Sequence, residues 1–433
     1  MNLFVIHAHD MGRHCGPYGG PARTPHLDRF ARSAVVFEDA HCAAPTCSPS
    51  RAAMWTGRTA HENGMLGLVH RGFDLNDRSR HLARVLAAQG YHTALAGLQH
   101  EYDPDHDDAI YRQVLPVAGA SLEGRDAASA RAAAAFLQNP PEQAWMLSLG
   151  LYYPHRPFVR DRENRATQVR GPEHLPDLPE VREDYADYLA TVEIADAAIG
   201  LALDALENSG QADRTLVVIT TDHGIAFPEM KCQLTAAGTG VALLLRGPGR
   251  FEGGRRIDAL ASHLDLVPTI CDYLEIPPPE GLHGRSLRPV LDGSADSIRE
   301  DLFAEVNFHA AAEPARGVRT KDHSYIRRFD DDPRVPLSNI DAGESKQAWV
   351  RKQGGAPRHE ALRLHDLRRD PLERENLIDD PAYAEIRTEM EARLRAWMER
   401  TNDPLLKGPL KRPKGAIVNT RDCIDPHDEI FED

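Results

Sequence analysis

The chain has 433 residues, of which 41% are hydrophobic and 27% charged, and its formal net charge is −15. This composition is ordinary for a globular protein, but the length exceeds what one hydrophobic core usually organises. We therefore expect one large and one smaller domain. A surface this negative repels polyanions, which argues against nucleic acid and long sulfated polymers as tight partners.

The apolar runs of the sequence are short. Val241–Leu245, one of the longest, cannot span a bilayer, so we expect no membrane partner. The first residues, Met1–Ile6, predict a buried strand rather than an export signal. Six cysteines are too few for a disulfide framework, which favours reduced thiols. We therefore predict a cytoplasmic protein and make no prediction of its oligomeric state.

Strand and helix patterns alternate along the first two thirds of the chain. Strands are predicted at 3–7, 35–37, 91–96, 145–150, 215–221 and 241–245. Helices are predicted at 24–31, 48–56, 81–88, 127–137, 180–208 and 264–274. This order is typical of an α/β fold, in which a mainly parallel sheet lies between helices. The polar stretch 160–179 is predicted to be a loop over the active-site face.

After about Asp301 the pattern changes to short strands with turns, at 302–306, 317–320 and 324–329, followed by a helix at 381–400. We predict a catalytic domain over 1–300 and a small antiparallel α+β domain over 301–405. The remaining residues, 406–433, are predicted to be an irregular tail without assigned chemistry.

Polar residues follow the first predicted strand. His7, His9 and Asp10 lie where that strand ends, and ligands of open α/β sheets gather at the carboxyl ends of strands. Two imidazoles and a carboxylate there indicate a metal site. The alternative is a polar loop in which Asp10 caps a turn.

The stretch Cys47-Ser48-Pro49-Ser50-Arg51 precedes and opens a predicted helix. By itself it is also typical of a small buried cysteine before a capped helix with proline in its first turn. It resembles the C-x-P-x-R signature of type I sulfatases, of the alkaline phosphatase superfamily. Further family motifs occur in family order over residues 1–400, at Thr24–Ala31, Pro154–Pro157, Asp222–Gly224, Asp265–Leu274, Gly281–Leu287 and Glu375–Leu377. Within the family, residues 63–68 and 222–228 resemble the heparan N-sulfatases, the N-sulfoglucosamine sulfohydrolases.

The resemblance implies an alkaline-phosphatase-like fold and a formylglycine nucleophile, which a formylglycine-generating maturation enzyme would form from Cys47. It implies one divalent metal, held by Asp10, Asp222, His223 and the nucleophile at Cys47. His9 would ligate the metal or lie just outside it. Calcium is expected from the family, whereas two histidines favour manganese or zinc.

The resemblance also implies roles for the remaining site residues. Arg51 and Lys231 would contact the sulfate, His100 would act on the second hydroxyl of the nucleophile, and His155 would protonate the leaving group. Two positions depart from the family pattern: His9 replaces an aspartate, and Leu98 replaces a lysine.

These features predict hydrolysis of a sulfate ester or sulfamate on a small sugar, most specifically N-sulfoglucosamine at a non-reducing end. One alternative is a phosphonate monoester or phosphodiester hydrolase of the same superfamily. Another is a non-catalytic relative that binds sulfated glycans.

Overall fold

The computed structural model describes residues 1–104, 109–117, 121–248, 253–428 and 431. Its large sheet has eight strands in the order β4-β3-β5-β1-β6-β7-β2-β8. The strands are β1 Asn2–Ala8, β2 Val35–His41, β3 His92–Gly97, β4 Gln113–Val114, β5 Trp145–Gly150, β6 Thr215–Thr221, β7 Leu243–Arg246 and β8 Arg255–Ser262. In this described sheet β7 alone runs antiparallel to its neighbours, which confirms the predicted mixed, mainly parallel sheet.

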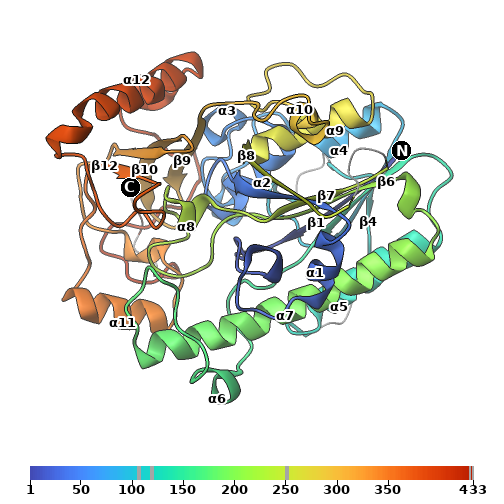
Figure 1. Cartoon of the computed structure of the whole chain (residues 1–433), viewed down its shortest axis with the longest axis horizontal. Coiled ribbons are helices and arrows are strands. Elements are labelled where there is room, and N and C mark those ends of the chain that lie inside the picture. The colour runs from blue at the N-terminus through green and yellow to red at the C-terminus, as the bar shows by residue number, and fades with distance from the viewer. Residues whose placement is uncertain (105–108, 118–120, 249–252, 429–430, 432–433) are drawn as a thin grey trace.

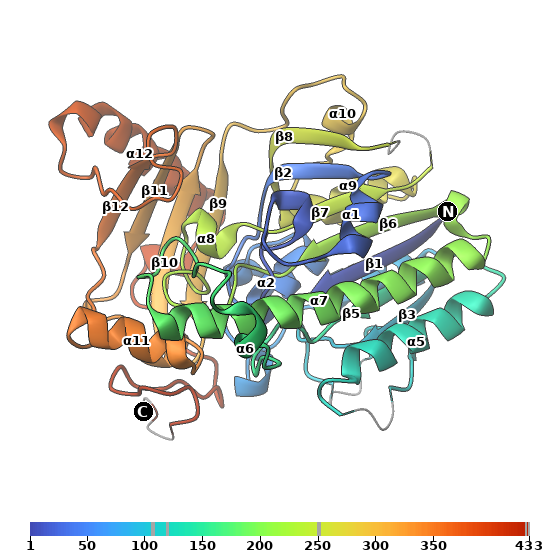
Figure 2. The same ribbon diagram turned by 60° about the horizontal axis from the view of Figure 1, so that its bottom comes forward.

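Helices cover both faces of this sheet. They are α1 Pro25–Ala31, α2 Cys47–Thr56, α3 Ala60–Asn63, α4 Leu82–Ala88, α5 Arg125–Gln138, α6 Arg162–Arg165, α7 Pro179–Asn208, α8 Ala236–Thr239, α9 Leu266–Tyr273 and α10 Arg288–Leu291. Short 3-10 turns lie at Gly16–Tyr18, Val69–Arg71, Arg78–Arg80, Ala212–Arg214, His263–Asp265, Leu337–Asn339, Pro381–Tyr383 and Pro404–Leu406. Figures 1 and 2 show α1, α5 and α7 together on one face of the sheet.

The side chains of β1 alternate between two hydrophobic cores. Phe4 and Ile6 lie in the core that α1, α5 and α7 cover, whereas Leu3 and Val5 lie in the core formed with α2, α4 and α9. A strand buried on both faces has no polar side, which is why it reads as one continuous apolar run.

A second sheet of four antiparallel strands follows in the order β12-β11-β10-β9. These strands are β9 Leu302–Phe308, β10 Ala312–Arg319, β11 His323–Arg328 and β12 Leu362–Asp366, and two further helices are α11 Glu344–Gln353 and α12 Ala384–Arg400. Leu394 and Trp397 of α12 pack on Tyr325 and Leu364 of the sheet. Figure 2 shows this small sheet beside the large one, as the fold prediction expected.

Some elements differ from the sequence prediction. The structure adds the edge strands β4, β8 and β12 and the helix α11, and it places the short helix α6 inside the predicted loop 160–179. The missed elements are polar: β8 begins with two exposed arginines, and α11 is mostly charged. Trp349 of α11 nevertheless packs in the core that α7 covers, so the chain returns to the large sheet after β11.

The described part of the C-terminal tail has irregular backbone; residues 429–430 and 432–433 lie outside the described residues. It is not detached, because Ala416 and Val418 are buried in the core of the large sheet. All six cysteines are free. Among the described helices, none is both long and apolar enough to cross a bilayer.

Candidate active site

The carboxyl ends of four strands lie side by side at one end of the large sheet, which is called the edge below. In the sheet register, Gly97 of β3 pairs with Gly150 of β5, which in turn pairs with His7 of β1, and Ala8 of β1 pairs with Thr221 of β6. The loops that follow these strands therefore begin side by side. Because they carry His100, His155, Asp10 and Asp222, the topology gathers residues that lie far apart in the sequence.

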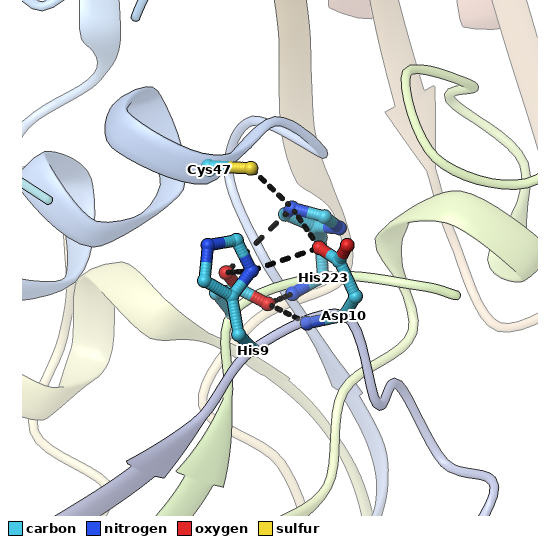
Figure 3. Close-up of side chains that lie close together, drawn as sticks. His9, Asp10, Cys47 and His223 are labelled. Atoms are coloured by element: carbon cyan, nitrogen blue, oxygen red, sulfur yellow. Dashed lines mark hydrogen bonds and ion pairs between the residues drawn. The ribbon is translucent and has the colours of Figure 1, made fainter. Parts of the chain in front are cut away.

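Cys47 is the first residue of α2 and lies directly at this edge. Thr46 before it has an extended backbone, and the cysteine side chain is only 2% exposed. Its Sγ atom lies 3.5 Å from Nε2 of His223 (Figure 3). Cys47 thus stands at a helix N-terminus, as predicted, but inside the protein rather than at its surface.

Four side chains converge on Cys47 and form a cluster of five with it. Each contributes one potential metal-ligand atom, and these atoms all lie within 4.8 Å of one another; the residues are His9, Asp10, Cys47, Asp222 and His223. This set is identical to the metal ligands predicted from the sequence. His7, the other imidazole near the end of β1, faces Ser148 and Arg51 instead.

The two carboxylates are locked by backbone and side-chain contacts. Oδ1 of Asp222 accepts hydrogen bonds from the backbone N–H groups of Asp10, at 2.8 Å, and His223, at 2.9 Å. Oδ2 of Asp222 accepts from Arg51 at 3.1 Å, and Oδ2 of Asp10 accepts from Lys231 at 3.2 Å. Asp10 itself has a left-handed backbone, with φ of 52°. Such a conformation costs free energy in a non-glycine residue and is typical of functional sites.

The electrostatics keep these carboxyls ionised although both are fully buried. Burial opposes ionisation of Asp10, but Lys231, His155 and His223 outweigh it, so the pKa of Asp10 is well below its usual value. Burial likewise opposes ionisation of Asp222, and His223, His9 and Arg51 again lower its pKa. The site therefore presents two carboxylates at neutral pH.

The imidazoles are oriented as ligands. Nδ1 of His223 lies 2.8 Å from the carbonyl oxygen of Gly224, so it donates there and leaves the lone pair of Nε2 facing the cluster. Nδ1 of His9 lies 2.9 Å from Oδ1 of Asp10 and 3.1 Å from Oδ2 of Asp222. Burial holds the pKa of His9 well below its usual value, so the ring is neutral, the form that binds metals. Two carboxylates and two imidazoles at this spacing fit a divalent cation.

The other predicted residues surround this cluster. His155 points Nε2 at Oδ2 of Asp10, 3.9 Å away, while its Nδ1 donates to the carbonyl oxygen of Arg156 at 2.6 Å. The ring of His100 lies 5.8 Å from that of His9. Arg51 contacts Asp222 and His7, so its guanidinium faces the metal cluster. All nine predicted residues thus lie in one region of the molecule.

The sequence prediction missed three neighbours of the site. Asp341 lies 2.9 Å from Nζ of Lys231, and the buried His309 lies close enough to this pair for both charges to influence its pKa, which burial lowers to about 3. The ring of His70 stacks on that of His100, with centroids 5.5 Å apart. None of the three belongs to a periodic pattern or a motif, so nothing in the sequence singles them out.

Comparison with known proteins finds matches over most of the chain. The sequence profile described as Sulfatase matches residues 1–276, and the profile described as N-sulphoglucosamine sulphohydrolase, C-terminal, matches residues 233–345. N-sulphoglucosamine sulphohydrolase from Homo sapiens is 29% identical over 464 residues, covering 94% of this chain and 92% of the human protein.

Solved structures share the fold. One, in complex with its substrate D-glucosamine-2-N,6-O-disulfate, superposes with a TM-score of 0.75 at 18% identity, covering 94% of this chain and 99% of the other. The phosphonate monoester hydrolase from Silicibacter pomeroyi superposes with a TM-score of 0.69 at 21% identity, covering 92% and 95% of the two chains. At such identities the likeness is one of fold alone. The profile match, by contrast, covers more than half of the chain and includes Cys47, Asp222 and His223, and it shows that this protein is an enzyme of the sulfatase family.

Proposed function

We propose that this sulfatase hydrolyses a sulfamate or sulfate ester on a small sugar, with N-sulfoglucosamine at a non-reducing end as its preferred substrate. The observation that carries the proposal is the convergence of Cys47 with two carboxylates and two imidazoles within 4.8 Å. The likeness to human N-sulphoglucosamine sulphohydrolase over nearly the whole chain supports the choice of sugar.

Cys47 would act after oxidation to formylglycine, whose hydrated aldehyde supplies one hydroxyl to attack sulfur and another to expel sulfate afterwards. Because Cys47 is 2% exposed, a maturation enzyme would have to reach it before the chain folds. Burial also raises the pKa of the Cys47 thiol well above its usual value. The unmodified thiol would therefore be a poor nucleophile, which supports the need for modification.

The metal would be held by Asp10, Asp222, His9 and His223 together with residue 47. When bound, a divalent cation would withdraw charge from the sulfate oxygens. The family resemblance favours calcium as the bound ion, whereas the two nitrogen donors favour manganese or zinc. Lys231 and Arg51 add fixed positive charge beside the cluster, which stabilises the charge that develops on the sulfate group.

Proton transfer to the leaving group falls to His155. Its Nδ1 is occupied by the carbonyl oxygen of Arg156, so Nε2 is the nitrogen that faces the site. Nitrogen leaves poorly from sulfur unless it is protonated, so a proton on Nε2 would matter most for a sulfamate. The ring of His100 lies 5.8 Å from that of His9, and His100 would take a proton from the nucleophile.

The test compares turnover of N-sulfoglucosamine, an aryl sulfate and an aryl phosphonate by purified protein, after mass spectrometry of the peptide that contains residue 47. We expect the aldehyde in that peptide and the highest kcat/KM on N-sulfoglucosamine. Faster phosphonate hydrolysis would favour the phosphonate monoester hydrolase alternative, and Cys47→Ala is the matched inactive control. The non-catalytic alternative would be favoured if the protein binds the sugar but does not turn it over, whether or not Cys47 is modified.

A further inference from the structure

A cavity of about 470 Å³ opens beside the proposed catalytic residues. Its lining includes His155 and Asp341, together with residues of the loop before α6, the start of α11 and the C-terminal tail. Its volume is in the range of pockets that bind small molecules. A sugar attached to the group that reacts at Cys47 would extend into this space.

The charges that line the cavity are almost all paired. Arg156 binds Asp184 at 2.7 Å, and Arg162 binds both Asp187, at 2.6 Å, and Glu344, at 2.7 Å. Asp341 is paired with Lys231. Every carboxylate of the lining therefore already has a cationic partner.

Arg160 is the exception. It lines the cavity and is exposed, and among the described residues no hydrogen bond or ion pair to its guanidinium is found. The lining therefore offers a ligand an unpaired positive charge, although the formal net charge of the protein is −15. An unpaired guanidinium favours a carboxylate or sulfate, which it can bind through two parallel hydrogen bonds.

The tail places a second donor in the same cavity. His427 lines it next to Pro426. Two anchors hold this part of the tail: Arg71 binds the side chain of Asn419 at 2.7 Å and the carbonyl oxygen of Pro426, and Lys346 binds the carbonyl oxygen of Ile424 at 2.6 Å. The imidazole is therefore kept at the cavity although the tail has no regular secondary structure.

We propose that Arg160 and His427 form a second anion-binding subsite, which binds a carboxylate or sulfate on the sugar next to the one that reacts. This inference rests on the proposed function for the position of the reacting sugar. It adds that the preferred substrate is a short oligosaccharide with an anionic second sugar, rather than a free monosaccharide. The tail, to which the sequence assigned no chemistry, would then take part in substrate recognition.

The experiment measures kcat/KM for N-sulfoglucosamine and for three disaccharides that have N-sulfoglucosamine as the first sugar. The second sugar is a uronic acid in one disaccharide and the same sugar with its carboxyl group reduced in another. In the third, the second sugar is carboxyl-reduced and carries a 2-O-sulfate. The proteins are the wild type, Arg160→Gln, His427→Gln and the control Arg170→Gln. Arg170 is an exposed arginine that follows α6, outside the cavity lining.

We expect the wild type to prefer a disaccharide with an anionic second sugar over the one whose second sugar is neutral. The preferred disaccharide identifies the anion as carboxylate or sulfate. Arg160→Gln and His427→Gln should each lower that preference about fivefold through KM, whereas Arg170→Gln should keep the wild-type preference. In the wild type, equal kcat/KM for disaccharides with an anionic and with a neutral second sugar would overturn the subsite. Equal losses in Arg160→Gln and Arg170→Gln would also overturn it, because they would indicate a long-range effect of charge.

A binding measurement separates this inference from the proposed function. Calorimetry measures the affinity for two reaction products that lack the N-sulfate: glucosamine linked to the uronic acid, and glucosamine linked to the 2-O-sulfated, carboxyl-reduced sugar. If no sulfated sugar is turned over but Arg160→Gln weakens binding of either product about fivefold and Arg170→Gln does not, the function falls and the subsite stands. If turnover is intact and neither product binds more weakly to Arg160→Gln or His427→Gln, the subsite falls and the function stands. Melting temperatures of the variants confirm that each is folded.

Discussion

Lys231 and Asp341 form an ion pair of 2.9 Å although they come from different parts of the fold. Lys231 follows β6 of the large sheet, whereas Asp341 precedes α11, after the small sheet has begun. Nζ of Lys231 also lies 3.2 Å from Asp10, so the ammonium stands between two carboxylates. The positive charge of Lys231 is therefore shared between Asp10 and Asp341.

Asp341→Asn should therefore weaken metal binding. The amide keeps the shape of the side chain but not its charge, so Lys231 would pair with Asp10 alone and compete with the cation for it. We expect metal affinity and kcat/KM to fall about tenfold, measured by metal titration and by initial rates. Asp331→Asn, an exposed acid nearby in the sequence, is the control. Unchanged metal affinity in Asp341→Asn would contradict this role.

Arg51→Ala should destabilise the fold as well as the site. Arg51 is fully buried and binds the buried Asp222 at 3.1 Å, so its removal leaves a carboxylate with one fewer partner and a cavity in its place. Breaking a buried pair in this way typically costs about 3–5 kcal/mol. Urea unfolding monitored by circular dichroism measures the loss. A change under 1 kcal/mol, as at an exposed ion pair, would show that Arg51 is not needed for the fold.

His9→Asp should change the preference for metals. The family pattern has an aspartate at this position, and here Nδ1 of His9 points at both Asp10 and Asp222. Exchange of a nitrogen donor for a hard oxygen donor favours calcium over zinc. Titration of metal-free protein with each ion gives the ratio of the two affinities, and we expect it to shift toward calcium by at least tenfold. A ratio that stays the same would place His9 outside the metal site.

His155→Ala should affect sulfamates more than activated aryl sulfates. An aryl leaving group departs without a proton, whereas the nitrogen of N-sulfoglucosamine needs one. We expect kcat on the sulfamate to fall by about 10²–10⁴ and kcat on the aryl sulfate by much less. The rates of wild type and variant on both substrates decide the question. Similar losses on the two substrates would mean that His155 positions the site rather than protonating the leaving group.

The stability of the protein should fall in mild acid, in part because of His263. This residue is buried, its Nε2 lies 2.9 Å from the hydroxyl of Thr220, and burial lowers its pKa to about 3. Below pH 6.5 the unfolded chain takes up a proton that the folded one does not, so stability present above that pH is lost as the pH falls toward 3.

Between pH 7 and pH 5, His263 alone should contribute a loss of about 2 kcal/mol in the free energy of unfolding. His263→Asn, which cannot titrate in this range, should show a pH dependence smaller by that amount. Urea unfolding of both proteins at the two pH values gives the difference. If the wild type and the variant lose the same free energy, His263 is not responsible.

Part of this protein could be predicted from its sequence because the information is local. The apolar run Leu3–Ile6 predicts a strand buried on both faces. The resemblance of the Cys47–Arg51 and Asp222–Gly224 motifs to type I sulfatases implies which residues meet at the end of that strand. The rule that parallel strands end at one edge of a sheet then brings Asp10 and Asp222 together.

Only the tertiary structure decided the rest. Asp341, His70 and His427 carry no local signal, and they reach the site because the chain returns to it through long-range packing. The direction of Arg51, toward Asp222 and His7, depends on which buried groups need its charge and its donors. The tail likewise reads as an irregular polar segment, and its position follows from two buried cations, Arg71 and Lys346, that bind its backbone. Pairings of this kind are set by burial and charge in three dimensions, which the order of residues along the chain does not reveal.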